Sequence, residues 1–223
     1  MPARIRSVNV VHALIPDTRG ELDRTAIDKR PVAGRVAVRP AGPAQVGLDG
    51  DQICDRRHHG GPDQAVYAYA VEDRAWWARE LGRALDPGVF GENLSTEGLD
   101  VTGAVIGERW RVGTDGLVLE VTAPRIPCRT FQGWLDEPHW VRRFTERGAP
   151  GAYLRVVAAG SVGAGDEVEV LGRPGHGVTI GDVLVVRRAP ADGLQRMLEM
   201  AGLNEELAEV ARRDLAARVS AKR

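Results

Sequence analysis

The sequence contains very little cysteine. Of its 223 residues, only Cys54 and Cys128 carry a thiol. Two cysteines are too few for a disulfide scaffold, a four-thiolate zinc site or an iron–sulfur cluster, and a chain of this length can bury enough apolar surface to fold without such cross-links. Each thiol is therefore either a buried apolar group or a reactive one.

Long apolar runs and an excess of charge of one sign are also absent. No stretch approaches the roughly eighteen consecutive apolar residues of a membrane span, and the first apolar run is interrupted by Asn9 and His12, unlike the core of a secretory signal. The net charge of −1 gives no basis for wrapping nucleic acid. We expect a cytoplasmic protein that binds neither a membrane nor nucleic acid.

Lysine is scarce as well. All but two of the 30 basic residues are arginine, which indicates a coding bias, and the exceptions are Lys29 and Lys222. Lys222 belongs to the tail, whereas Lys29 is internal. An ammonium group is a compact charge suited to phosphate or oxo groups, so Lys29 is a candidate anion ligand, with a solvated surface lysine as the alternative.

Short β-rich runs separated by Gly, Pro and Asp turns extend from about residue 4 to residue 172. Several alternate as half-buried strands do, and their number and spacing predict a mainly β fold, a barrel or a sandwich. The runs are Ile5–Leu14, Gly34–Val38, Ala65–Tyr69, Arg109–Val112, Leu117–Ala123, Tyr153–Ala158 and Glu167–Leu171.

Two helices are predicted within the β-rich region. Glu72–Leu81 places Trp76 and Trp77 near one face, and Glu137–Arg147 carries Trp140 and Phe144 at helical spacing. We interpret these aromatic side chains as core rather than as ligand contacts.

The composition changes after the linker GRPGHG. Leu194–Gly202 and Asn204–Val219 are amphipathic, with Asn204 a possible N-cap for the second helix. Thr179–Arg188 is ambiguous, because its VLVV run favours a strand while Thr179 and Asp182 resemble a capping box. We place the boundary between two parts of the chain at residues 172 and 173.

Cys128 ends the segment PRIPC. Arg125 and Arg129 flank it, and nearby positive charge favours the reactive thiolate. A thiolate is a soft ligand for a heavy metal or a nucleophile that can carry sulfur. The motif alone also fits a buried structural cysteine.

A second cluster is GLDGDQICDRRHHGGPDQAVY, in which His58 and His59 follow Arg56 and Arg57. Histidines and carboxylates at this density suit a divalent metal such as zinc, although no second ligand pair lies at the usual spacing. They also suit a hydrogen-bonded loop whose arginines position an anion.

Asn93 lies in a third segment, GENLSTEGLDVTG. Its carboxamide can donate and accept hydrogen bonds, so it can contact a ligand. The alternative is a turn asparagine that supports its own backbone.

Five segments in order carry a resemblance to a known family: DKRPVAG, GLDGDQICDRRHHGG, FGENLSTEGL, IGERWRVG and PRIPC. They resemble the MOSC domain, the molybdenum cofactor sulfurase C-terminal domain, and more narrowly its YiiM-like bacterial stand-alone members. The resemblance runs from roughly residue 25 to 172, and the part after Gly175 is similar to the three-helix extension of those members. Cys54 departs from the pattern, since a small residue such as alanine is expected there.

The resemblance implies a MOSC-type β-barrel (1–172) with peripheral helices, a C-terminal three-helix extension (173–223), and helix in Thr179–Arg188. It implies that Cys128 ligates molybdenum in a molybdopterin cofactor, with His59 and Asn93 lining the same cleft as further catalytic candidates. We select basic residues by their charge as candidates for binding the cofactor's phosphate: Lys29, Arg30, Arg56, His58, Arg125 and Arg129.

Related MOSC proteins reduce N-hydroxylated compounds, so the resemblance implies a molybdenum-dependent oxidoreductase. The chain has no Rossmann glycine fingerprint and too few cysteines for a cluster, so electrons must come from a separate flavin or iron–sulfur reductase. The basic end of the tail is a candidate docking element for it, and the oligomeric state is left open, with a homodimer as one option. Two alternatives remain: a carrier of sulfur as a Cys128 persulfide, and a non-catalytic module that binds a pterin or another anion.

Overall fold

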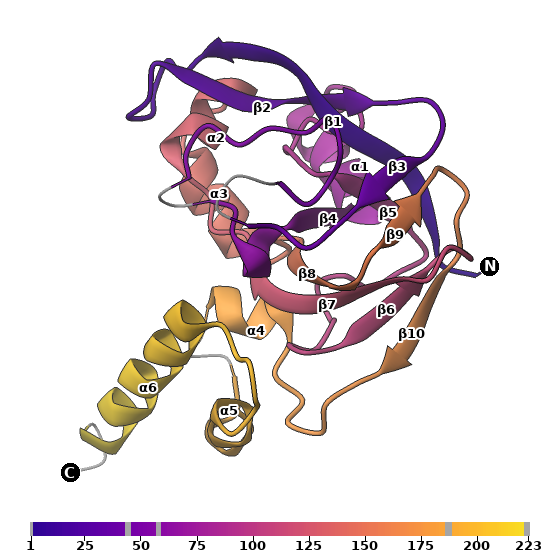
Figure 1. The fold of residues 1–223 in the computed structure, drawn as a ribbon. Coiled ribbons are helices and arrows are strands. Elements are labelled where there is room, and N and C mark those ends of the chain that lie inside the picture. Colours follow the sequence, from indigo (N-terminus) through magenta and orange to yellow (C-terminus); the bar gives the residue numbers. More distant parts are fainter. Residues whose placement is uncertain (1, 43–45, 57–58, 186–188, 221–223) are drawn as a thin grey trace.

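The computed structural model describes residues 2–42, 46–56, 59–185 and 189–220 (Figure 1). Its strands are β1 (Arg4–Pro16), β2 (Arg24–Pro31), β3 (Val36–Val38), β4 (Val66–Ala70), β5 (Leu94–Glu97), β6 (Arg109–Val112), β7 (Leu117–Pro124), β8 (Ala152–Ala158), β9 (Gly160–Val162) and β10 (Val168–Gly172). Its helices are the 3-10 helix η1 (Pro62–Gln64), α1 (Val71–Leu81), α2 (Arg129–Leu135), α3 (Trp140–Arg147), α4 (Ile180–Leu184), α5 (Ala191–Leu198) and α6 (Glu205–Ser220). Across these ranges, no helix is both long and apolar enough to cross a bilayer.

One mixed sheet organises the molecule. Eight strands follow the order β10-β6-β7-β8-β4-β5-β1-β2, and β3 pairs with β9 in a separate ribbon. The start of β1 also contacts β10, because Val168 N–H donates to the Ala3 carbonyl at 2.8 Å and Ile5 N–H donates to the Asp166 carbonyl at 2.8 Å. The sheet therefore curls round its core, and the prediction of a mainly β fold with peripheral helices is confirmed.

A second, aromatic core lies between the sheet and helices α1, α2 and α3. Trp77, Trp140 and Phe144 are buried in it together with Phe90 and Phe131. The Trp77 and Trp140 rings have centroids 4.4 Å apart. The prediction that the helical aromatics are core residues is confirmed for these three, while Trp76 is only partly buried.

The predicted helix at 137–147 begins three residues later than expected. Pro138 disfavours a helical conformation at Glu137, and His139 adopts a left-handed backbone with φ 57° directly before α3. Helix α2 was not predicted at all. It follows Pro127 and Cys128, which end the extended PRIPC segment.

The three-helix extension is confirmed by α4, α5 and α6. A capping box starts α4, since Thr179 Oγ1 accepts from the Asp182 N–H and the Asp182 carboxylate accepts from the Thr179 N–H. This local bonding outweighs the strand propensity of the VLVV run, and Ile180–Leu184 form a helix. The last part of the predicted helix, residues 186–188, lies outside the described residues. The domain boundary at 172 and 173 stays a prediction.

Candidate functional site

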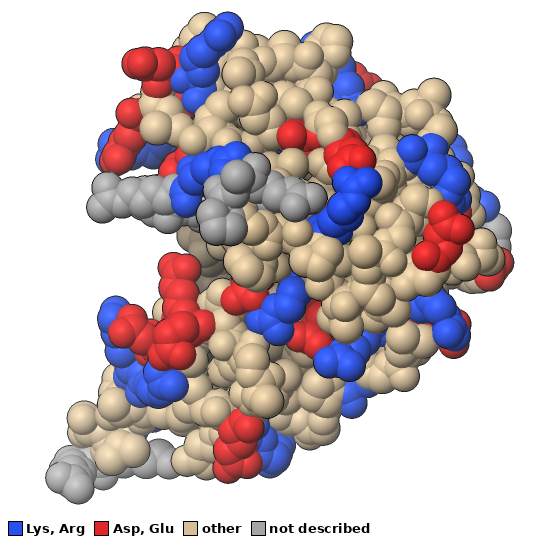
Figure 2. All heavy atoms as spheres, in the orientation of Figure 1, with Lys and Arg blue, Asp and Glu red and all other residues tan. Residues whose placement is uncertain are grey.

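A cavity of about 900 Å³ opens between the sheet and the C-terminal extension. Its walls include the β1–β2 hairpin, the loop before α2, and helices α4 and α6. Figure 2 shows this face of the molecule hollowed above α6. Ligand pockets in proteins commonly enclose about 300–1,000 Å³, so the cavity can accept a cofactor-sized molecule.

The cavity gathers most of the residues that the sequence nominated. The nominated residues among its lining are Lys29, Arg56, His59, Asn93, Arg125, Cys128 and Arg129. Arg30 is not among them, because neighbouring residues of β2 face opposite sides and its guanidinium forms two hydrogen bonds with Asp28. His58 lies outside the described residues.

A buried ion pair stands at one wall of the cavity. The Lys29 ammonium contacts the Asp51 carboxylate, and the two side chains are only 10% and 5% exposed. Asp51 also accepts from the Val11 N–H at 3.0 Å and from Asn93 Nδ2 at 2.8 Å. Lys29 is therefore buried and is not the solvated surface lysine of the alternative interpretation, but Asp51 already balances its charge.

Asn93 is buried and fully bonded. Its Oδ1 accepts from the Tyr67 N–H at 3.0 Å, and its Nδ2 donates to Asp51 and to the Asn9 carbonyl. These bonds tie β4 to β1 and orient the Lys29–Asp51 pair. A ligand can therefore bind the Asn93 amide only by replacing one of these partners. In this structure Asn93 positions Asp51, and a catalytic role for Asn93 stays a prediction.

The segment before Asn93 is shaped by Glu92, a buried carboxylate that sequence reasoning missed. Glu92 accepts from the Gly88 N–H at 2.7 Å and the Phe90 N–H at 3.1 Å, and it pairs with Arg74. Gly88 has φ +87°, and an added Cβ would lie 2.2 Å from the Lys29 carbonyl oxygen. The glycine thus allows this loop to pack directly on the strand that carries Lys29.

Both thiols line the same cavity. Cys128 immediately precedes α2 in an extended conformation, with φ −125°. Cys54 comes from the loop of the second cluster, and burial raises the pKa of its thiol, while Arg24 opposes that rise. No motif in the sequence indicates that the two cysteines share one cavity.

Arg125 is buried beside the cavity without a carboxylate partner among the described residues. It is 6% exposed, and its Nε has no hydrogen bond to any described group. The guanidinium lies over the rings of Phe131 and Tyr67, at 4.5 and 5.2 Å from their centroids. Aromatic faces stabilise a cation, but a buried charge of this kind is costly unless it is paired.

His59 is oriented by Tyr153, another residue that sequence reasoning missed. The Tyr153 hydroxyl lies 3.2 Å from His59 Nδ1. Burial raises the pKa of the Tyr153 phenol, and the neighbouring Arg125 guanidinium opposes that rise. Gly60 and Gly61, with φ of 89° and 76°, turn the chain after His59 into η1.

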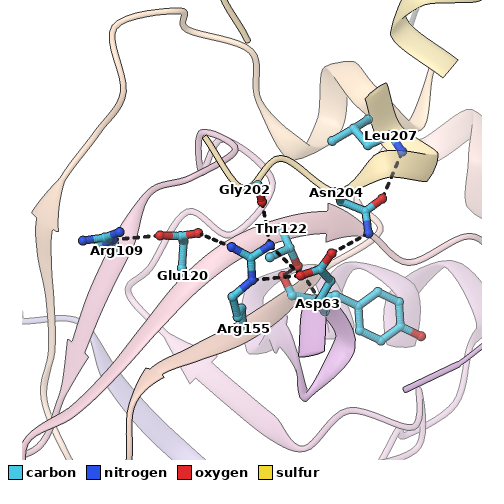
Figure 3. A network of polar contacts seen from close by, with 9 residues as sticks. Asp63, Arg109, Glu120, Thr122, Arg155, Gly202, Asn204 and Leu207 are labelled. Carbon is cyan, nitrogen blue, oxygen red and sulfur yellow. Dashed lines mark hydrogen bonds and ion pairs between the residues drawn. The ribbon is translucent and has the colours of Figure 1, made fainter. Parts of the chain in front are cut away.

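A polar network fastens this turn to the C-terminal extension (Figure 3). Arg155 Nε donates to Asp63 Oδ1 at 2.8 Å, and an Arg155 Nη2 donates to the Gly202 carbonyl at 2.7 Å. Asn204 donates to the other Asp63 oxygen at 2.9 Å and accepts from the Leu207 N–H at 2.9 Å. Asn204 is thus the predicted N-cap of α6 and also a link between α6 and the His59 turn.

Comparison with known proteins identifies the family. The sequence profile of the MOSC domain matches residues 55–169. The chain is 32% identical over 189 residues to the uncharacterized protein YflK of Bacillus subtilis (strain 168), covering 83% of this chain and 82% of that protein. It is also 32% identical over 167 residues to protein YiiM of Escherichia coli (strain K12), covering 72% and 73%. This chain belongs to the MOSC family.

Two further similarities bear on the MOSC protein. A crystal structure of YiiM from Geobacillus stearothermophilus has the same fold, with a TM-score of 0.74, 24% identity, and 96% and 100% coverage of this chain and that one. A protein of Gibberella moniliformis (strain M3125 / FGSC 7600) named reductase is 32% identical over 119 residues, which are 52% of this chain and 21% of that protein.

The residues of this MOSC protein fit an anionic, metal-bearing cofactor better than a site built from several metal ligands. Within the described ranges, no group of three or more His, Cys, Asp or Glu side chains is placed to share a metal ion. The zinc reading of the second cluster therefore gains no support there. A thiol beside a buried arginine whose Nε has no hydrogen bond is compatible with a cofactor that brings most of its own metal ligands.

Proposed function

We propose that this MOSC protein binds a molybdenum–pterin cofactor in the cavity and reduces N-hydroxylated compounds to amines. The overall reaction consumes R–NH–OH, two electrons and two protons and yields R–NH2 and water. A bound cofactor of this kind supplies oxygen-atom transfer coupled to two electrons. Because the chain carries no flavin or cluster motif, we propose that a separate reductase supplies the electrons.

Arg125 carries the proposal. Arg125 is a cation that is 6% exposed, forms no ion pair with a carboxylate of the described residues and has an unbonded Nε, so it is suited to bind an anion that enters the cavity. Cys128 lines the same cavity, three residues further along the loop. In the proposal, Cys128 is the thiolate ligand of the metal, while Arg125 binds an anionic group of the cofactor and Lys29 contributes a second, partly balanced cation.

His59 is proposed to supply one of the two protons to the N–OH group as its N–O bond breaks. Arginine only donates hydrogen bonds, so the phenol oxygen next to Arg125 accepts and the phenol proton is directed to His59 Nδ1. The neutral imidazole then carries its own proton on Nε2. A histidine in that state can donate to the N–OH oxygen of a substrate.

Cofactor retention tests the proposal. The protein is purified from a host that makes molybdenum cofactor, and molybdenum and pterin are quantified for the wild type, Cys128→Ala and Cys54→Ala. We expect near-stoichiometric molybdenum in the wild type and Cys54→Ala, and at least a tenfold loss in Cys128→Ala with an unchanged circular dichroism spectrum. The control is matched, because both thiols line the cavity.

A Cys128→Ala variant that keeps its molybdenum would remove the proposed ligand. A wild type without molybdenum, but with a persulfide on Cys128, would favour the sulfur-carrier function instead. With molybdenum bound, the holoprotein and a chemical reductant should convert an amidoxime or a hydroxylaminopurine to its amine. No turnover across such a panel would contradict the reductase activity while leaving cofactor binding intact.

A further inference from the structure

Burial divides the cavity lining into a polar floor and an exposed mouth. The floor side chains Asn93, Arg125 and Tyr153 are 4%, 6% and 8% exposed. The mouth includes three large apolar side chains that are far more exposed: Leu22 at 37%, Ile126 at 61% and Val210 at 39%. Three large apolar side chains thus lie at the opening beside several charged ones, while these three polar groups lie deep in the cavity.

This apolar mouth is unusual within the described surface. The other large apolar side chains that are exposed there are Val157, Leu171 and Val219, and none of these lines the cavity. Single exposed apolar residues are normal in soluble proteins, but their concentration at one opening marks a binding surface. Half of the exposed set therefore gathers at one site.

Three distant parts of the chain build the mouth. Leu22 comes from the β1–β2 hairpin, Ile126 from the loop two residues before Cys128, and Val210 from α6. Their side chains line the cavity instead of a flat outer face. The Asn204 link to Asp63 fixes the start of α6, and with it the position of Val210 (Figure 3).

We propose that Leu22, Ile126 and Val210, here called the apolar mouth, bind the carbon body of the substrate and determine specificity. This inference rests on the proposed function. The N–OH group would reach the polar floor, while an apolar or aromatic body would remain between the three side chains. The substrates selected are N-hydroxylated compounds with such a body, in preference to small polar ones.

The experiment compares two substrates of the same chemistry, benzamidoxime and acetamidoxime, in the loaded holoenzyme with a chemical reductant. The mouth variants are Leu22→Ser, Ile126→Ser and Val210→Ser. Leu171→Ser and Val157→Ser are matched controls, because these residues are 43% and 44% exposed and lie away from the cavity. Binding of benzamidoxime is measured separately, by ligand-observed NMR without reductant.

Each mouth variant should lower kcat/KM for benzamidoxime by roughly three- to tenfold, mainly through KM, because partial loss of apolar contact weakens binding without altering the chemistry. Acetamidoxime turnover and both controls should be unchanged. Equal losses for the two substrates, or no loss for either, would overturn the inference, and the second result would leave the mouth as a surface for a protein partner. If the wild type turns over neither substrate but the mouth variants still weaken benzamidoxime binding, the specificity inference stands and the proposed reaction fails.

Discussion

At the scale of single residues, the site depends on which groups have partners. Asn93, selected from sequence as a ligand contact, has all its main hydrogen-bonding positions occupied by protein. Arg125, selected only for its charge, is a buried cation that forms no ion pair with a carboxylate of the described residues. Sequence shows residue type and order, but it does not show which side chains bond to one another.

Tyr153 illustrates the same limit. It lies in an apolar strand, β8, where its pattern predicts only a core residue, yet its hydroxyl contacts His59.

We expect Tyr153→Phe to preserve the fold and release His59 from a single tautomer, because the phenol proton no longer reaches Nδ1. Long-range 1H–15N NMR of the imidazole nitrogens measures the tautomer of His59, and His59→Gln assigns its signals. An unchanged His59 spectrum in Tyr153→Phe would contradict the proposed direction of the hydrogen bond.

In the loaded protein, the same Tyr153→Phe substitution should lower kcat by about tenfold, less than the roughly 100-fold or greater effect of losing a general acid, because His59 itself remains. KM should change little, since the ring still fills the wall of the cavity.

His176 gives a prediction for stability against pH. Its Nδ1 accepts from the Val178 N–H at 3.0 Å and its Nε2 donates to the Ile106 carbonyl at 2.9 Å, which requires a neutral ring. Burial lowers the pKa of His176 below the usual value near 6.5. The unfolded chain therefore takes up a proton first, so the contribution of His176 is complete above about pH 6.5 and is lost as the pH falls below it.

Urea unfolding at several pH values tests this contribution. We expect His176→Gln to cost about 1–2 kcal/mol at pH 7, from the loss of two buried hydrogen bonds, and the difference from the wild type to shrink toward pH 5. A difference that is constant across this range would mean that His176 does not titrate on unfolding.

At the scale of elements, strands with clear alternation were predicted well, and those defined by their neighbours were not. β7 and β10 lie within one residue of the expected ranges at each end. β2, with the sequence RTAIDKRP, has no such alternation and exists because it pairs with β1. Helix α2 was missed because its run of 7 residues, RTFQGWL, is too short to show a helical period.

The link between α6 and the His59 turn gives a prediction for this element. Arg155→Ala removes the bonds to Asp63 and Gly202, and we expect a loss of about 2 kcal/mol of stability with faster hydrogen exchange at the start of α6. Arg109→Ala is the control, because Arg109 contacts Glu120 of the same network from an exposed position (Figure 3) and such pairs contribute less than about 1 kcal/mol. Equal exchange in the two variants would show that Arg155 does not anchor α6.

At the scale of the whole molecule, the extension and the sheet share one core. Leu194, Met197 and Leu207 of the extension belong to the same buried cluster as Ile5 and Leu119 of the sheet. Amphipathic helices this short need a surface to pack against, and the shared cluster shows that the sheet supplies it.

A shared core predicts a single unfolding transition. Differential scanning calorimetry should give one peak with equal calorimetric and van't Hoff enthalpies. Met197→Ala, at a fully buried position, should lower that one transition through a loss of about 2–5 kcal/mol. Val219→Ala, at a position that is 58% exposed, should leave it in place, and a second peak that moves alone in Met197→Ala would show independent domains.

The cavity lining runs from Asp17 near one end of the chain to Val210 in the last helix. During synthesis the sheet can begin to form early, but this pocket has no complete wall until α6 has left the ribosome and docked through Asn204. A molecule that depends on contacts with α6 can therefore be held in full only after that helix has been translated and docked. The opening between the hairpin, the PRIPC loop and α6 therefore takes its final form last, when the rest of the lining is already present.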